Sequence, residues 1–293
     1  MTDQKSKIEK NRISILGCGW LGFPLAQRLL ASDITTKVNG STTSLPKLEN
    51  FKAKGINGYL LELNPAFENE SALTESFFNA ETLIISLPPR SGKNGPGFYV
   101  KQMEAVISEI RKSPVNNIVF ISSTGIYPEL NRIMTEDDVA LPEQSAMEDM
   151  VTAEVMIKSL SPERTVTILR LGGLLGYNRI PGKYVKGKKD VTTGGVPVNY
   201  IHRDDAIGII MMMLESGLAN ETFNIVAPLH TFRREIYETS CAQFGWEAPK
   251  YAVPEIEQDF KIISSEKLSL FYKYDFKFPD PLNFFYSLHD NEI

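Results

Sequence analysis

A glycine-rich hexapeptide near the amino end has the residue types and spacing that hold a phosphate group. The string GCGWLG covers residues 17–22, after the apolar run ISIL and before the helical pattern LGFPLAQRLL. In a G-x-G-x-x-G string, the glycines permit a tight turn, close approach of a pyrophosphate, and packing of the helix on the strand. The helix amino end then offers unpaired N–H groups and a positive dipole end to the anion. We therefore assign Gly17, Gly19, Trp20, Leu21 and Gly22 to a dinucleotide cofactor.

A turn without a ligand is the alternative interpretation of this string. It is disfavoured because three glycines cost backbone entropy that a merely structural turn does not require. A further test is an acidic residue about 20 positions later, which would hold the ribose 2'-OH of NAD. The sequence instead has Ser41, Thr42 and Thr43, followed by Lys47. Hydroxyls and a cation can accept a 2'-phosphate, so we expect NAD or NADP, lean to NADP, and assign Ser41 and Thr42 to the cofactor. Ordinary turn residues are the alternative.

Short apolar runs alternate with helical patterns through the first 230 residues. The runs ISIL, TTKVN, GYLLEL, TLIIS, NIVFIS and TVTILRL predict strands, and helices are expected from about Leu21, over about 97–112 and around 146–160. Runs that are apolar throughout indicate strands buried on both faces of a parallel sheet. The order predicts an α/β fold, a Rossmann-type doubly wound parallel sheet.

The later sequence predicts a small C-terminal substrate lobe. Gly and Pro become frequent between about 172 and 197, which indicates loops that leave the sheet, and the chain becomes aromatic from about 228. We expect residues 1–175 to form the dinucleotide-binding Rossmann domain, which also takes in roughly 200–226. Residues 176–199 and 227–293 then form the smaller substrate lobe.

The composition excludes several other classes of protein. A net charge of -5 with scattered Lys and Arg residues gives no basic face, so we expect no nucleic-acid partner. Two cysteines make no disulfide framework, which favours a reducing compartment. The apolar run before Cys18 is too short for a secretory signal, and AIGIIMMML at 206–214 is far short of the roughly 18 residues of a membrane span. We therefore expect a cytoplasmic protein with no membrane contact, and we assign no metal ligands.

Longer stretches resemble the extended short-chain dehydrogenases/reductases, the sugar-nucleotide epimerase and dehydratase group. NIVFISSTGIYP at 117–128 resembles that group's strand and turn, and further matches follow in ILRLGGLLG, VNYIHRDDAIGII, ETFNIVAP and KIISSEKL. Together, GCGWLG, SLPPRSG, FISSTGIY and VNYIHRDD resemble the atypical YeeZ-like subgroup, whose members are called NAD-dependent epimerases. The resemblance spans nearly the whole chain and implies a Rossmann-type sheet with a substrate lobe.

The family's catalytic pair is absent from its expected position. That pair is Tyr-x-x-x-Lys, with a Glu four residues beyond the Lys, and the Tyr exchanges the proton of the substrate hydroxyl. Counting back from Glu154, the Tyr position falls on Ala146 and the Lys position on Met150, and neither can move a proton. A second string with this spacing, Tyr184 to Lys188, lies in the loop-rich segment instead of on a helix, and is the disfavoured alternative pair.

The same matching implies roles for residues around the empty positions. Ser123 falls on the family's Ser/Thr that hydrogen-bonds the reacting oxygen, and with Tyr127 it is our catalytic candidate, although Tyr127 is mostly structural in the family. Asp149, three residues from Ala146 on roughly the same helix face, is an alternative acid or base, although a solvated charge explains it as well. We assign Leu87, Pro88, Ser122 and Leu171 to the cofactor, and Arg90, Thr124, Arg170, Asn199 and His202 to the substrate.

Two functions stay open at this point. The first is an NAD(P)-dependent oxidoreductase or epimerase on a small polar, sugar-like substrate, in which Ser123 orients the reacting carbonyl and a non-Tyr group or water handles the proton. The second is a non-catalytic NAD(P)-binding sensor or scaffold. We favour the enzyme slightly. A homodimer formed through the helices around 97–112 and 146–160, as in many relatives, also stays open.

Overall fold

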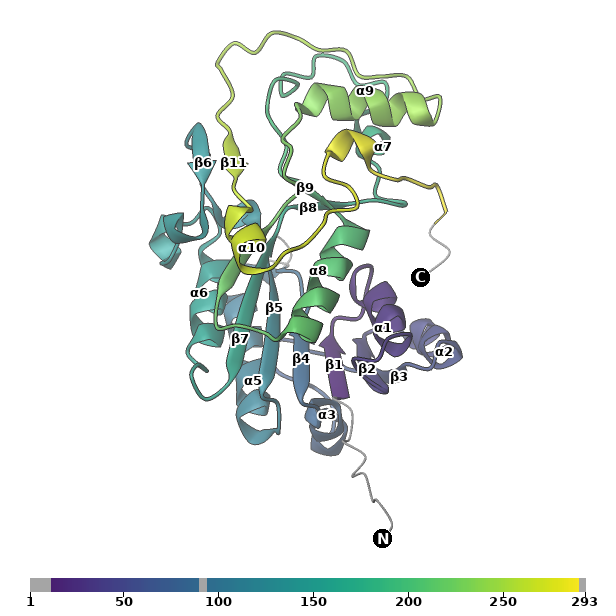
Figure 1. Cartoon of the computed structure of the whole chain (residues 1–293), viewed down its shortest axis with the longest axis vertical. Helices are drawn as coiled ribbons and strands as arrows, with labels where there is room; N and C mark the ends of the chain where they lie inside the picture. Colours follow the sequence, from purple (N-terminus) through teal and green to yellow (C-terminus); the bar gives the residue numbers. More distant parts are fainter. Residues whose placement is uncertain (1–11, 90–93, 290–293) are drawn as a thin grey trace.

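The computed structural model describes residues 12–89 and 94–289. Seven parallel strands form the central sheet in the order β10-β7-β5-β4-β1-β2-β3 (Figure 1). They are β1 (Arg12–Leu16), β2 (Lys37–Thr42), β3 (Asn57–Leu60), β4 (Thr82–Ile85), β5 (Asn117–Ser123), β7 (Thr165–Leu171) and β10 (Thr222–Ile225). The chain adds strands outward from β1 in one direction and then from β4 in the other. This is the predicted Rossmann-type doubly wound α/β fold.

Helices cover both faces of the sheet, which is why its strands are apolar throughout. All four residues of β4 are buried, as are six of the seven in β7. The helices are α1 (Gly22–Leu30), α2 (Leu45–Ala53), α3 (Ser71–Phe78), α5 (Phe98–Lys112), α6 (Glu148–Lys158) and α8 (Arg203–Ser216). One hydrophobic core packs α3, α5 and α6 on one face, and a second packs α1, α2 and α8 on the other. The apolar run at 206–214 lies in α8, and no helix of the described residues could span a membrane.

Shorter elements gather beyond the carboxyl ends of the sheet strands. Two parallel strand pairs are formed by β6 (Arg132–Met134) with β11 (Lys261–Ile263) and by β8 (Gly173–Leu175) with β9 (Tyr200–His202). The helices there are α7 (Pro181–Val185) and α9 (Arg233–Gln243), whereas α10 (Glu266–Phe271) packs against β10 of the main sheet. The 3-10 turns are η1 (Thr124–Ile126), η2 (Glu136–Asp138), η3 (Pro142–Gln144) and η4 (Pro281–Asn283). In Figure 1, α7 and α9 lie at the top of the molecule, above β8 and β9.

Candidate functional site

The glycine loop joins β1 to α1 at the point where the strand order reverses. Gly17 has a φ of +87°, and a Cβ there would lie 2.6 Å from Ser86 O, so only glycine fits. A Cβ on Gly22 would lie 3.0 Å from Ile15 Cγ2, so this glycine lets α1 pack on β1. A Cβ on Gly19 would meet only the carbonyl oxygen of Gly17, at 4.0 Å. The described residues therefore leave the space beside Gly19 unfilled.

The amino end of α1 has no cap from the protein. Leu21 precedes the helix without a side-chain cap hydrogen bond, and the first turn contains no acidic residue. The positive end of the helix dipole thus lies beside the open backbone of Gly19. A diphosphate group is the ligand that this combination of N–H donors, dipole and missing Cβ accommodates. The residues of the loop therefore fit the dinucleotide that the sequence predicts.

Side chains after β2 support the loop, and one cation there is unpaired. Ser41 Oγ accepts a hydrogen bond from Gly17 N at 2.8 Å, so its hydroxyl shapes the loop. Thr42 Oγ1 accepts from Ser44 N at 3.1 Å.

The Lys47 ammonium lies close enough to the loop to act on Cys18. Burial raises the pKa of Cys18 to about 12, and the charge of Lys47 opposes this rise. The Lys47 ammonium is thus near the loop, and it forms no hydrogen bond or ion pair with the described residues.

Trp20 connects the glycine loop to the turn that follows β8. Its Nε1 donates to Asn178 Oδ1 at 2.8 Å. The guanidinium carbons of Arg179 and Arg203 lie 4.0 Å and 4.6 Å from the centre of its ring. We call Trp20, Asn178, Arg179 and Arg203 the Trp20 clasp. Because the indole is used inside the protein, only the backbone of Trp20 is left for the predicted cofactor contact.

Arg170 belongs to a buried network instead of a substrate pocket. Its side chain is 1% exposed and lies 2.7 Å from Glu154 Oε2. All five of its N–H groups donate to protein acceptors, namely the carboxylate of Glu154, the phenol oxygen of Tyr127 and two backbone carbonyls. Ser122 Oγ donates to the same carboxylate. We therefore reassign Arg170 from the substrate to the interior, and only the backbone of Ser122 is left for the cofactor.

The phenols of Tyr127 and Tyr99 also form hydrogen bonds inside the protein. Tyr127 is fully buried, donates to Asn224 Oδ1 at 2.7 Å and accepts from Arg170. Burial raises the pKa of Tyr127 to about 12. Tyr99 is 1% exposed and donates to Leu87 O at 3.0 Å. Neither phenol is available for proton exchange with a substrate, so we reassign Tyr127 to a structural role.

His202 is buried at the start of α8 with both ring nitrogens engaged. Its Nδ1 accepts from Asp204 N at 3.1 Å, which caps the helix, and Nε2 lies 3.2 Å from Phe285 O. These partners require the neutral tautomer with a proton on Nε2. Burial lowers the pKa of His202, so the ring stays neutral. The ring packs on Phe278 at 4.0 Å and does not line the cavity described below, so we reassign His202 to packing.

Ala146 and Met150, which stand where the family has its Tyr and Lys, form structural contacts. Ala146 is exposed and precedes α6, and its N donates to Ile126 O at 2.9 Å. Met150 is 2% exposed and packs in the core under α5 and α6. Asp149 Oδ2 accepts from Gly97 N at 2.7 Å, at the amino end of α5. The carboxylate that the sequence offers as an acid or base therefore caps a helix.

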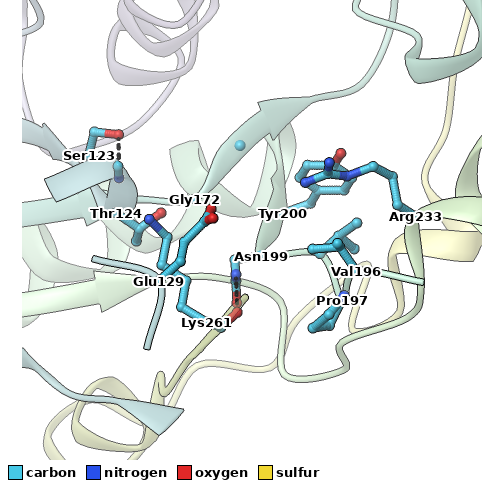
Figure 2. A pocket seen from close by; sticks show the side chains of 13 residues that line it. Ser123, Thr124, Glu129, Gly172, Val196, Pro197, Asn199, Tyr200, Arg233 and Lys261 are labelled. Atoms are coloured by element: carbon cyan, nitrogen blue, oxygen red, sulfur yellow. Dashed lines mark hydrogen bonds between the residues drawn. The ribbon is translucent and has the colours of Figure 1, made fainter. Parts of the chain in front are cut away.

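A cavity of about 260 Å³ opens at the carboxyl end of β5, beyond the sheet. It brings together three predicted residues, Ser123, Thr124 and Asn199. Ser123 Oγ accepts from Gly125 N at 3.0 Å and stays half-exposed to the cavity (Figure 2). The Asn199 amide is bonded on both sides to the backbone of β11, at Lys261 O and Ile263 N. Asn199 thus fixes the wall of the cavity, while Ser123 faces the space inside.

The sequence analysis missed four lining residues with polar or charged side chains: Glu129, Tyr200, Arg233 and Lys261. Lys261 Nζ donates to Tyr127 O, at the end of the turn that begins beside Ser123. Burial lowers the pKa of Lys261, and the charge of Glu129 opposes this shift. Figure 2 shows Lys261 and Glu129 at the Thr124 end of the cavity and Arg233 at the Tyr200 end. Lys261 opens the KIISSEKL string, and this was the one available sequence signal.

The other predicted residues are divided between the two sites. Leu87 borders the glycine loop, since its Cδ2 would lie 3.1 Å from a Cβ on Gly17. Leu171 pairs with Ser123 across the sheet, and Pro88 is exposed after β4. Arg90 lies outside the described residues. Leu87 thus lies at the glycine loop, while Ser123 and Thr124 line the cavity at the carboxyl end of β5.

Comparisons with known proteins agree with this architecture. No family model matches the chain. Protein YeeZ of Escherichia coli (strain K12) is 30% identical over 271 residues, which are 92% of this chain and 97% of YeeZ. A short-chain dehydrogenase/reductase superfamily protein of Agrobacterium tumefaciens, solved with bound NAD, has a TM-score of 0.72 at 14% identity and covers 92% of this chain and 94% of that one. UDP-glucose 4-epimerase of Thermotoga maritima, solved with UDP-glucose, has a TM-score of 0.69 at 16% identity, with 92% and 96% covered.

The sheet order and the glycine loop at its switch point define a class, the α/β proteins with a Rossmann-type fold, and these solved structures share that fold. Within that class, the identity to YeeZ extends over almost the full length of both chains. The chain belongs to the YeeZ family.

Proposed function

We propose that this protein is an NAD(P)-dependent oxidoreductase or epimerase that acts on a small polar substrate. The observation that carries the proposal is that one edge of the sheet holds both an uncapped glycine loop and a cavity of about 260 Å³ at Ser123. Ligands of open α/β sheets bind in the crevice at this edge. In this account, residues 176–199 and 227–293 form the substrate lobe that closes the cavity from above.

The cofactor proposal rests on the residues of the glycine loop. The N–H groups around Gly19 would hold the diphosphate, and the Agrobacterium relative was solved with NAD in the same fold. When bound, the nicotinamide would exchange a hydride with the substrate carbon. The unpaired Lys47 beside the loop favours NADP, because its charge can meet a 2'-phosphate and no carboxylate of β2 repels one. Lys47→Glu should therefore weaken NADPH binding more than NADH binding.

The proton of the reaction requires a group other than the family's Tyr. Ser123 would orient the reacting oxygen by donating a hydrogen bond, but a hydroxyl alone is a poor base at neutral pH. Lys261 is the amine of the cavity, and burial has already lowered its pKa towards the range that general base catalysis needs. We assign proton exchange with the substrate hydroxyl to the Lys261 amine.

The alternative is a non-catalytic NAD(P) sensor, and the Trp20 clasp favours it. The indole of Trp20 joins the loop proposed to bind the cofactor to the turn at Asn178 and Arg179. A cofactor that moved Trp20 would therefore also move the lobe, without any reaction. The absence of a Tyr and Lys from positions 146 and 150 fits this alternative as well.

Measurements of cofactor binding and of turnover distinguish the enzyme from the non-catalytic sensor. NADPH and NADH are titrated by fluorescence transfer and thermal shift, and carbonyl and hydroxyl compounds are then screened at 340 nm and by NMR for epimers. An enzyme should lose turnover in Ser123→Ala and in Lys261→Met, with cofactor affinity nearly intact in both variants. Cofactor binding without any turnover would support the sensor, and no binding of either nucleotide would overturn both functions.

A further inference from the structure

We infer that the cavity recognises a substrate carrying an anionic oxygen group, a carboxylate or a phosphate, which docks on Arg233. This inference names a substrate class for the proposed function. It rests on the proposed function only because both use the same cavity. Arg233 is the first residue of α9, and its backbone N donates to Val196 O at 2.9 Å. The helix therefore fixes the start of the side chain at the cavity wall.

The guanidinium of Arg233 is buried in part and lacks a counter-charge. It lies against Tyr200 in Figure 2, and its charge and a hydrogen bond to the Tyr200 side chain oppose the rise in the pKa of Tyr200, to about 12, that burial causes. Arg233 Nε is buried without a hydrogen-bond partner in the described part of the chain. No ion pair of the described residues includes Arg233. Withdrawing a charge from water is unfavourable unless it is paired, so the open space beside it is the place for the missing partner.

Two other cations have a carboxylate partner inside the protein. The buried Arg170 is paired with Glu154 at 2.7 Å. The largely exposed Lys277 donates to the buried Asp204 at 2.9 Å. Within the cavity, Glu129 is the one carboxylate among the lining residues, and it lies at the other end, near Lys261. Arg233 thus differs from these cations in facing a cavity instead of a carboxylate.

The two ends of the cavity then have separate tasks. Arg233 offers the planar fork of donors that matches a carboxylate or a phosphate. Ser123 and Lys261 line the opposite end, where the proposed reaction takes place. A volume of about 260 Å³ is below the roughly 300 to 1,000 Å³ of pockets for drug-sized ligands. We therefore expect a small hydroxy or oxo compound with one acidic group, such as a sugar acid or a sugar phosphate.

The Nε–H of Arg233 provides a direct readout, because a buried donor without a partner must shift when an anion reaches it. The full chain, labelled with ¹⁵N-arginine and free of cofactor, is titrated with inorganic phosphate and separately with acetate at constant ionic strength in chloride. We expect a saturable shift of the Arg233 Nε–H with one or both probes, and the stronger probe indicates which acidic group the substrate carries. No saturable shift with either probe would overturn the inference.

Variants of two adjacent arginines provide the control. Arg234 stacks on Tyr251 at 4.4 Å, is exposed and does not line the cavity. We expect Arg233→Gln to weaken binding of the stronger probe at least tenfold and Arg234→Gln to change it less than twofold. Arg233→Lys keeps the charge without the fork and should give an intermediate affinity. Equal effects of the two Gln variants would contradict a site on Arg233. NADPH titration of the same samples is independent, so failure of the anion site and failure of the proposed function remain distinguishable.

Discussion

At the scale of single residues, the arginine within the strand segment ILRL illustrates how sequence matching and burial can disagree. Matching assigned Arg170 to the substrate, but its five N–H groups are used by Glu154, Tyr127 and two backbone carbonyls. A sequence gives no indication of which acceptors surround a side chain when those acceptors come from α6 and from the turns at η1 and η2. Ser123, by contrast, lines the cavity, so its assignment to the reacting oxygen stays a prediction.

The buried pair of Arg170 and Glu154 yields a prediction on stability. Arg170→Leu leaves the Glu154 carboxylate buried without its counter-charge, and such a loss costs about 3 to 5 kcal/mol. We expect that loss in the free energy of unfolding, measured in urea. The control is Glu221→Gln, which breaks the half-exposed pair with Lys267 and should cost less than about 1 kcal/mol. Similar costs for the two variants would contradict the structural role of Arg170.

His202 yields a prediction on pH dependence. Burial lowers the pKa of His202 below the usual 6.5. Between pH 6.5 and the folded pKa, the unfolded chain therefore binds a proton on this ring, whereas the folded chain does not. Its contribution to stability is therefore complete above pH 6.5 and decreases as the pH falls towards the folded pKa. We expect the free energy of unfolding to fall from pH 7.5 to 5.5, and to fall less in His202→Gln. The pKa of His230 is also lowered, so His230→Gln is measured beside it. Parallel curves for wild type and His202→Gln would refute this assignment.

At the scale of elements, the strands of the main sheet were predictable and the short strands were not. Continuous apolar runs such as ISIL and TVTILRL mark strands buried on both faces, and they became β1 and β7. By contrast, β6 and β11 are three residues long and pair Arg132 with Lys261, which are far apart in the sequence. No local pattern specifies a pairing at that distance. The lining lysine of the cavity was missed for this reason.

The start of α6 yields a prediction on helix capping. The sequence suggested a helix from about 146, but Glu148 is the first helical residue, and Asp149 accepts a hydrogen bond from Gly97 at the start of α5. Asp149→Ala should cost about 1 kcal/mol of stability, the usual loss for a helix cap, without changing the pH profile of any turnover. Glu148→Ala is the matched control, because that side chain is exposed and we expect no effect. A changed pH profile in Asp149→Ala would restore its role as an acid or base.

At the scale of the whole molecule, the fold and the position of the glycine loop were predictable, while the cavity was not. The glycine string lies in consecutive residues, so it can be recognised without a structure. The cavity combines Ser123 at the end of β5, Arg233 on α9 and Lys261 on β11. These segments meet only after the chain has folded. The central claim of this account is nevertheless the loop, because the proposed function requires a dinucleotide there.

Gly19→Ala tests that claim most directly. Its Cβ would meet only Gly17 O at 4.0 Å and its φ is not positive, so the variant should unfold at the wild-type temperature. The added methyl group would nevertheless occupy the space proposed for the diphosphate. Gly195→Ala is the control, since a Cβ there meets nothing and lies away from the loop. NADPH and NADH are titrated into all three proteins by calorimetry. We predict saturable binding to wild type and Gly195→Ala, and at least tenfold weaker binding to an equally stable Gly19→Ala. Equal affinity in Gly19→Ala, or no binding to wild type, would contradict the account.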